Sequence, residues 1–155
     1  MKLKFCGATR TVTGSCFYID TGDFKFLVDC GAFQGGDELE KLNYEPFPFD
    51  PASLDAVFLT HAHYDHCGRI PLLVKQGFKG RIIGTQPTRE LARIVLLDSA
   101  KLQKEEYERW QARSKDMPKG TNFSGEGMAY EQRKPLFTEE DVEDIFQFFD
   151  VYPYG

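Results

Sequence analysis

Residues 56–68 read AVFLTHAHYDHCG, and this stretch decides how the rest of the chain is interpreted. Its first five residues form a short apolar run bounded by polar residues, which is typical of a strand buried on both faces of a sheet. The next six residues hold all three histidines of the chain, with Asp65 between the second and the third. We therefore expect a buried strand that leads directly into a loop of metal-binding side chains.

The spacing of the four polar side chains suits two metal ions. On a strand, His61 and His63 would point the same way because side chains alternate between the two faces. In the tight turn that follows, Asp65 and His66 can reach a second position. Imidazole nitrogens and carboxylate oxygens are ligands that suit zinc or a similar divalent ion. A polar loop with chance histidines is the alternative, and the clustering of all three histidines beside an aspartate argues against it.

Strands precede the histidine stretch, and strands and helices alternate after it. We expect strands over 2–6, 15–20 and 25–29, the last two joined by the hairpin signal Thr21-Gly22-Asp23, and another strand over 81–84. A helix is expected over 70–76, a long helix from Thr88, and a last helix capped by Thr138. This order indicates an α/β domain with a mixed sheet and flanking helices.

The apolar spacing within the two later helices predicts which faces are buried. From Ser114 to Pro135 glycines and a proline interrupt the pattern, and we expect little regular structure there. In the long helix the expected face consists of Leu91, Ile94, Val95 and Leu102, widened by Leu96, Leu97, Tyr107 and Trp110. In the last helix it consists of Val142, Ile145, Phe146 and Phe149.

The composition is that of an ordinary globular domain, with 155 residues, 41% hydrophobic and 28% charged. The sequence shows no apolar run long enough to span a membrane and no secretory signal, so we expect a cytoplasmic location. Four cysteines without a C-x-x-C pair are typical of reduced, buried thiols. The net charge of −5 is unlike that of most nucleic-acid-binding domains, and the eight basic residues of 101–134 alternate with six acidic ones.

The motifs resemble those of a known family. Residues 60–68 (THAHYDHCG) resemble the signature of the metallo-β-lactamase superfamily, and residues 28–31 (VDCG) resemble its first motif. Residues 7–16 (GATRTVTGSC), 29–35 (DCGAFQG), 68–73 (GRIPLL) and 90–100 (ELARIVLLDSA) are similar to the β-CASP branch. That branch comprises RNA-processing nucleases related to the cleavage and polyadenylation endonuclease and to bacterial and archaeal exonucleases. The resemblance covers residues 1–103 and 135–155.

The resemblance implies an αββα sandwich, of which this chain supplies the N-terminal half. Residues 1–155 are then the N-terminal part of a metallo-β-lactamase domain, with a variable insertion at about 104–135. We expect the β-CASP domain to be absent from this chain. The implied activity is that of a zinc-dependent hydrolase, an RNA-processing phosphodiesterase in the full-length protein, with RNA as its partner.

The family also implies roles for individual residues. His61 and His63 would bind one zinc ion, and Asp65 and His66 would bind the second. Asp65 is in addition a catalytic candidate that orients the nucleophile. Asp29 is the other catalytic candidate, acting through the histidine loop whose geometry it fixes. The alternative for Asp29 is a simple turn residue at a strand end, and the sequence does not decide between the two.

The chain also departs from the family pattern, because the further ligands expected after His66 include histidines and none follows. We therefore expect a fragment that binds zinc weakly and is inactive by itself. Apolar faces such as that of Val142, Ile145 and Phe149 are expected to stay exposed and to favour self-association.

Two other functions stay open at this point. One is a different hydrolase on the same scaffold, acting on a thiolester or a lactam, since a fold does not fix a substrate. The other is a non-catalytic partner-binding module with a vestigial metal loop. Several single residues also have two interpretations. Asp98 and Ser99 either contact the metal loop or only cap and pack. Tyr107 and Trp110 either stack on bases or form core or hinge contacts. Cys67 is either a ligand or a small buried side chain.

Overall fold

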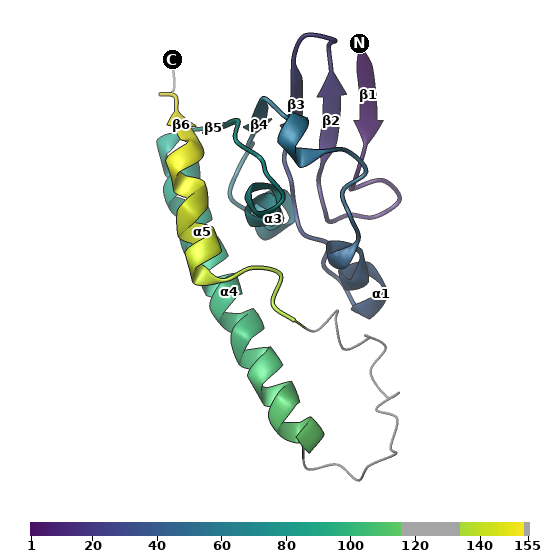
Figure 1. The fold of residues 1–155 in the computed structure, drawn as a ribbon, viewed down its shortest axis with the longest axis vertical. Coiled ribbons are helices and arrows are strands. Elements are labelled where there is room, and N and C mark those ends of the chain that lie inside the picture. Colours follow the sequence, from purple (N-terminus) through teal and green to yellow (C-terminus); the bar gives the residue numbers. More distant parts are fainter. Residues whose placement is uncertain (116–133, 154–155) are drawn as a thin grey trace.

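The computed structural model describes residues 1–115 and 134–153, which fold around one six-stranded sheet (Figure 1). The strands lie in the sheet in the order of the sequence. The first three strands pair antiparallel with their neighbours, and the third to the sixth strands pair parallel. The predicted α/β fold with a mixed sheet is thereby confirmed. The strands are β1 (Lys2–Phe5), β2 (Phe17–Asp20), β3 (Lys25–Val28), β4 (Ala56–Phe58), β5 (Arg81–Gly84) and β6 (Phe149–Val151).

Helices connect the parallel strands, as such crossovers require. The α-helices are α1 (Asp37–Glu40), α2 (Tyr64–Cys67), α3 (Ile70–Lys75), α4 (Gln86–Lys115) and α5 (Glu139–Ile145). Short 3-10 turns occupy Lys41–Tyr44, Pro51–Ser53 and Phe146–Phe148. Helix α5 packs against both α3 and α4, and it runs alongside the N-terminal half of the long α4 helix (Figure 1). None of the described helices is long and apolar enough to cross a membrane.

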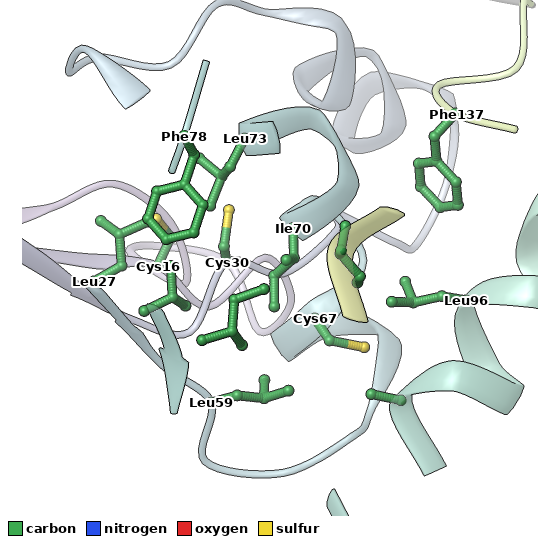
Figure 2. Packing of buried hydrophobic residues seen from close by; sticks show 14 of the residues in the cluster. Cys16, Leu27, Cys30, Leu59, Cys67, Ile70, Leu73, Phe78, Leu96 and Phe137 are labelled. Carbon is green, nitrogen blue, oxygen red and sulfur yellow. The ribbon is translucent and has the colours of Figure 1, made fainter. Parts of the chain in front are cut away.

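The hydrophobic core lies between one face of the sheet and the helices. Tyr18, Leu27, Val57 and Ile82 occupy one register row across four neighbouring strands, and all four are buried. Helical side chains cover this row, and Figure 2 shows several of them. Full burial of such a side chain stabilises the fold by roughly 1.5–3 kcal/mol. The covering residues include Ile70, Leu73, Leu96, Val142 and Ile145.

The opposite face of the sheet is apolar and more open. The Phe5 and Phe17 ring centroids lie 5.7 Å apart, and those of Phe26 and Phe58 lie 5.3 Å apart. Phe5 is 59% exposed and Phe58 is 37% exposed. The prediction that the strand before the histidines is buried on both faces is therefore wrong at Phe58, because its side chain lies on the face opposite the helix-covered row.

The buried face of α4 differs from the predicted one. Ala92, Leu96 and Ala100 are buried, whereas Leu91 and Ile94 are 54% and 64% exposed. Leu102, also predicted to be buried, is 48% exposed. The two small alanines on either side of Leu96 give the close approach that helix packing needs, and a search for large apolar residues misses them.

The ends of α4 also depart from expectation. The helix begins at Gln86 and not at Thr88, with the Thr85 hydroxyl accepting a hydrogen bond from the Thr88 N–H. It continues to Lys115, so the first part of the insertion expected at about 104–135 is helical. The remainder of the predicted irregular segment, residues 116–133, lies outside the described residues.

The last helix is capped as the sequence predicts. The Thr138 hydroxyl accepts from the Asp141 N–H, and the Asp141 carboxylate accepts from the Thr138 N–H. Val142 and Ile145 are fully buried, so the expectation that this face stays exposed is wrong: α3 and α4 cover it. Phe149, predicted on the same helix, is the first residue of β6.

Candidate metal centre

The histidine loop follows β4 at the edge of the sheet where neighbouring parallel strands end. Asp29 comes directly after β3, and Thr60 and His61 come shortly after β4, so they meet at this edge. Backbone bonds fasten the two loops together. Cys30 N–H donates to His66 O (2.9 Å), and Ser15 N–H donates to Asp65 O (2.8 Å).

Gly31 shows how closely these loops pack. A Cβ atom at Gly31 would lie 1.6 Å from the carbonyl oxygen of Asp65 and 2.6 Å from the amide nitrogen of His66. Real Cβ atoms essentially never approach another heavy atom within 3.0 Å. Glycine is thus required at this position because the backbone of the strand-end loop packs directly against the backbone of the metal loop.

The structure brings together all four residues singled out as metal ligands. Nε2 of His61 lies 3.1 Å from Nδ1 of His63, and the His61 and His66 ring centroids are 3.9 Å apart. Nε2 of His66 lies 3.6 Å from Oδ2 of Asp65. The donor atoms therefore fall into two pairs, His61 with His63 and Asp65 with His66. The second pair stands on α2, a single helical turn that the sequence analysis had treated only as a turn.

Asp29 is the hub of the hydrogen bonds behind the loop. Its carboxylate is buried and accepts from Nδ1 of His66 (2.7 Å), the Ser15 hydroxyl (3.1 Å) and the Thr60 N–H (2.9 Å). The Thr60 hydroxyl lies 2.9 Å from the same carboxylate. Because a carboxylate only accepts, Nδ1 of His66 carries the proton and Nε2 keeps its lone pair for a ligand.

The backbone of Asp29 adopts the left-handed conformation, with φ at 60°. Strain of this kind at a non-glycine residue persists only where the surroundings enforce it, and it is common at functional sites. Asp29 is therefore both a strand-end turn residue and the hydrogen-bond partner of the histidine loop, so the two interpretations hold together. Ser15 and Thr60, its other partners, were missed by the sequence analysis, although both lie within the quoted motifs.

Burial favours the neutral form of His61. Desolvation first, and then the neighbouring imidazoles of His66 and His63, hold the pKa of His61 below its ordinary value near 6.5. A neutral imidazole keeps the lone pair with which histidine binds a metal ion. The same loop therefore offers a nitrogen donor at neutral pH without first losing a proton.

The donor pairs fit zinc in chemical type and spacing. In a tetrahedral site with Zn–N distances of about 2.0–2.1 Å, two ligand atoms lie roughly 3.3 Å apart. The observed separations of 3.1 Å and 3.6 Å bracket that value. Over residues 1–115 and 134–153, however, no three His, Cys, Asp or Glu side chains surround one point closely enough to hold a metal ion. The fit is thus to two half-sites.

The structure separates several residues from these half-sites. Asp98 is exposed on α4. Ser99 bonds to Gln103 and to the side chain of Tyr64, whose hydroxyl the Gln103 amide also reaches at 3.4 Å, so it meets the loop at Tyr64 and not at a donor atom. Cys67 is fully buried, and burial raises the pKa of its thiol to about 12, which disfavours the thiolate that binds metals.

Tyr107 and Trp110 line the surface beside the loop. Their rings stack on each other with centroids 6.0 Å apart, and both side chains are half-buried. Together with Tyr64 they border a cavity of about 360 Å³. Neither belongs to the main hydrophobic cluster, so the core part of their predicted role is wrong.

Comparison with known proteins gives the chain a family. The model of the metallo-beta-lactamase superfamily matches residues 9–153. Ribonuclease TTHA0252 of Thermus thermophilus is 45% identical over 107 residues, which are 69% of this chain and 24% of that protein. The transcription termination factor FttA of Methanocaldococcus jannaschii is 36% identical over 117 residues, 76% of this chain and 18% of that protein.

A eukaryotic relative matches nearly the whole chain. Cleavage and polyadenylation specificity factor 73 of Drosophila melanogaster is 30% identical over 146 residues, which are 94% of this chain and 19% of that protein. The chain thus spans a quarter or less of the length of these three relatives. With its fold, its histidine loop and these matches, the chain belongs to the metallo-β-lactamase superfamily, and its relatives are RNA-processing nucleases of the β-CASP branch.

Proposed function

We propose that the full-length protein is a zinc-dependent phosphodiesterase that cleaves RNA. The observation that carries the proposal is the pairing of donor atoms, 3.1 Å apart in His61 and His63 and 3.6 Å apart in Asp65 and His66. The choice of RNA rests on the relatives, one of which is named a ribonuclease and another a cleavage and polyadenylation factor.

Each residue of the loop has a proposed role. His61 and His63 hold one ion, and Asp65 and His66 hold the other. Bound zinc supplies Lewis acidity and a water molecule of lowered pKa, which phosphodiester hydrolysis at neutral pH requires. Asp65 orients the attacking water by accepting its hydrogen bond. Asp29 keeps the proton of His66 on Nδ1, so that Nε2 stays directed toward the metal position.

We further propose that this chain alone binds zinc weakly and does not cleave RNA. It contains three histidines, and each donor pair supplies two protein ligands. Stable zinc sites generally have three or four protein ligands, with water completing the shell of catalytic ones. The remaining ligands would come from other parts of the full-length protein. A cytoplasmic location remains a prediction. Self-association of the isolated chain does too, but the burial of Val142 and Ile145 removes the reason given for it.

The test compares two variants of the full-length protein. His63→Ala is expected to lower bound zinc and to abolish cleavage of a short single-stranded RNA. Lys101→Ala, an exposed substitution on α4, serves as the control and should leave both unchanged. A full-length protein that turns over a thiolester or a lactam and leaves RNA intact would contradict the proposal. So would RNA cleavage that His63→Ala leaves intact.

A further inference from the structure

We propose that a second site, separate from the histidine loop, binds a phosphate group. It lies in a cavity of about 340 Å³ between the loop that follows β1 and the segment around residues 45–48. Arg69 forms part of its wall, as do Gly7, Thr9 and Thr11. None of these residues belongs to either donor pair of the metal centre.

Arg69 is a buried cation without a counter-ion. The residue is 6% exposed, and within the described part of the chain its guanidinium forms no ion pair. Nη2 donates to the carbonyl oxygen of Glu45 at 2.9 Å, whereas Nε is enclosed and has no hydrogen-bond partner. A buried charge is costly unless it is paired, and an unsatisfied buried donor adds to that cost.

Aromatic contacts offset part of this cost. The guanidinium carbon lies 4.3 Å from the centre of the Phe47 ring and 5.9 Å from that of Phe33. Such cation–π contacts are favourable and hold the planar group in place. They do not neutralise its charge. An oxyanion in the adjoining cavity would, and a guanidinium held rigidly in this way suits a phosphate group.

The loop that follows β1 contributes Gly7, Thr9 and Thr11 to the cavity wall and carries backbone donors. Among the described residues, the N–H groups of residues 7–14 donate no hydrogen bond to a protein acceptor. Ala8 and Arg10 in this loop have positive φ values, 51° and 65°, although neither is glycine. Successive free N–H groups in a backbone that alternates into the left-handed region form the concave nests that bind phosphate and similar anions.

The charge around the cavity is mixed but favours an anion. Lys4 places its ammonium group 2.8 Å from the carbonyl oxygen of Pro48, a residue of the cavity wall. Arg10 is exposed on the loop, and the one acidic residue of the wall, Glu45, is also exposed, so its charge is screened by water. The buried guanidinium is therefore the charge that an entering anion meets at short range.

The cavity lies at the same edge of the sheet as the metal centre. Strand β1 runs in the same direction as β3 and β4, because β2 is antiparallel to both β1 and β3, so the loops that follow these strands share one edge. The ligand is either a phosphate of an RNA strand or a free phosphate ion. We assign the RNA strand, and this part of the inference rests on the proposed function.

The experiment uses the chain in EDTA, so that neither metal nor cleavage enters the result. Inorganic phosphate is added while amide signals are followed by NMR, with saturable shifts expected in residues 7–13. Arg69→Met keeps most of the apolar stem of the side chain and should weaken phosphate binding at least about tenfold. Arg81→Met removes an exposed arginine that pairs with Asp150 elsewhere on the sheet, and it should leave phosphate affinity unchanged.

Thr11→Val provides a second variant in case Arg69→Met fails to fold, and it should weaken phosphate binding because it removes a hydroxyl group from the cavity wall. A short single-stranded RNA, measured by fluorescence anisotropy, should bind more tightly than phosphate and lose affinity in Arg69→Met. If the chain bound phosphate but bound the RNA no more tightly than phosphate, the RNA assignment would be overturned. No saturable shift, or equal weakening by Arg69→Met and Arg81→Met, would overturn the site itself. Because no cleavage is measured, failure here is distinct from failure of the proposed nuclease activity.

Discussion

Nδ1 of His66 donates a 2.7 Å hydrogen bond to the carboxylate of Asp29, and these two residues connect the ends of two neighbouring parallel strands. The bond determines which nitrogen of His66 faces the metal position. It also joins the metal loop to Asp29, a buried residue that accepts further hydrogen bonds from Ser15 and Thr60. The orientation of His66, a proposed ligand, thus depends on Asp29, which belongs to neither donor pair.

Asp29→Asn should weaken zinc binding by the full-length protein about 10- to 100-fold, the usual effect of losing the hydrogen-bond partner of a ligand histidine. The amide nitrogen of asparagine cannot accept the bonds that the carboxylate accepts. Zinc affinity is measured by competition with a chromophoric chelator. Asp23→Asn, in the exposed hairpin turn, is the control. Equal affinities of Asp29→Asn and wild type would show that the bond does not support the ligand.

Gly31→Ala should lower the free energy of unfolding of the chain by roughly 2 kcal/mol or more, since the new methyl group meets the backbone of Asp65 and His66. Gly84→Ala is the matched control, because a Cβ there makes only ordinary contacts, the nearest at 3.5 Å. Urea unfolding followed by circular dichroism gives both values. If the two variants were equally stable, the two loops would not pack as closely as the structure shows.

The stability of the metal-free chain should fall as the pH drops below about 6.5. The pKa of His61 is lowered in the folded state, by burial first and by its histidine neighbours second. The unfolded chain therefore binds this proton more readily, and the stability present above the unfolded pKa is lost as the pH falls toward the folded one. Melting temperatures in EDTA between about pH 8 and pH 5 measure the effect. The melting temperature of His61→Gln should depend less on pH, whereas that of Lys79→Gln should depend on pH as in the wild type. A wild-type melting temperature that does not change with pH would refute this account.

Leu96→Ala should destabilise the chain by about 2–5 kcal/mol, as expected for a fully buried leucine. Leu91→Ala, the same substitution five residues earlier on the same helix, should cost less than about 1 kcal/mol because Leu91 is 54% exposed. Thermal unfolding of the two variants side by side measures the difference. A larger loss for Leu91→Ala would mean that the buried face of α4 is the one predicted from its large apolar residues.

The sequence predicted best where the signal is local. The histidine spacing, the hairpin at Thr21-Gly22-Asp23 and the Thr138 cap each depend on a few consecutive residues, and the structure has the hairpin and the cap where they were expected. The buried face of α4 was misjudged because apolar residues surround that helix, and only the helices packed against it, α5 and α2, decide which side is covered. Strand β6 was missed for a related reason, since Phe149 to Val151 pair with β5 from more than sixty residues away.

The strained backbone at Asp29 separates two properties that selection can act upon. A glycine at this position would relax the left-handed conformation, yet it would remove the carboxylate that accepts from His66. In a mutant library sorted for folding alone, the relief of backbone strain by glycine at residue 29 is opposed by the loss of the buried bonds from Ser15 and Thr60. In a library sorted for turnover by the full-length protein, the same aspartate should be recovered. Asp29 thus keeps a left-handed backbone because its carboxylate is needed by three separate donors, one of them a proposed metal ligand.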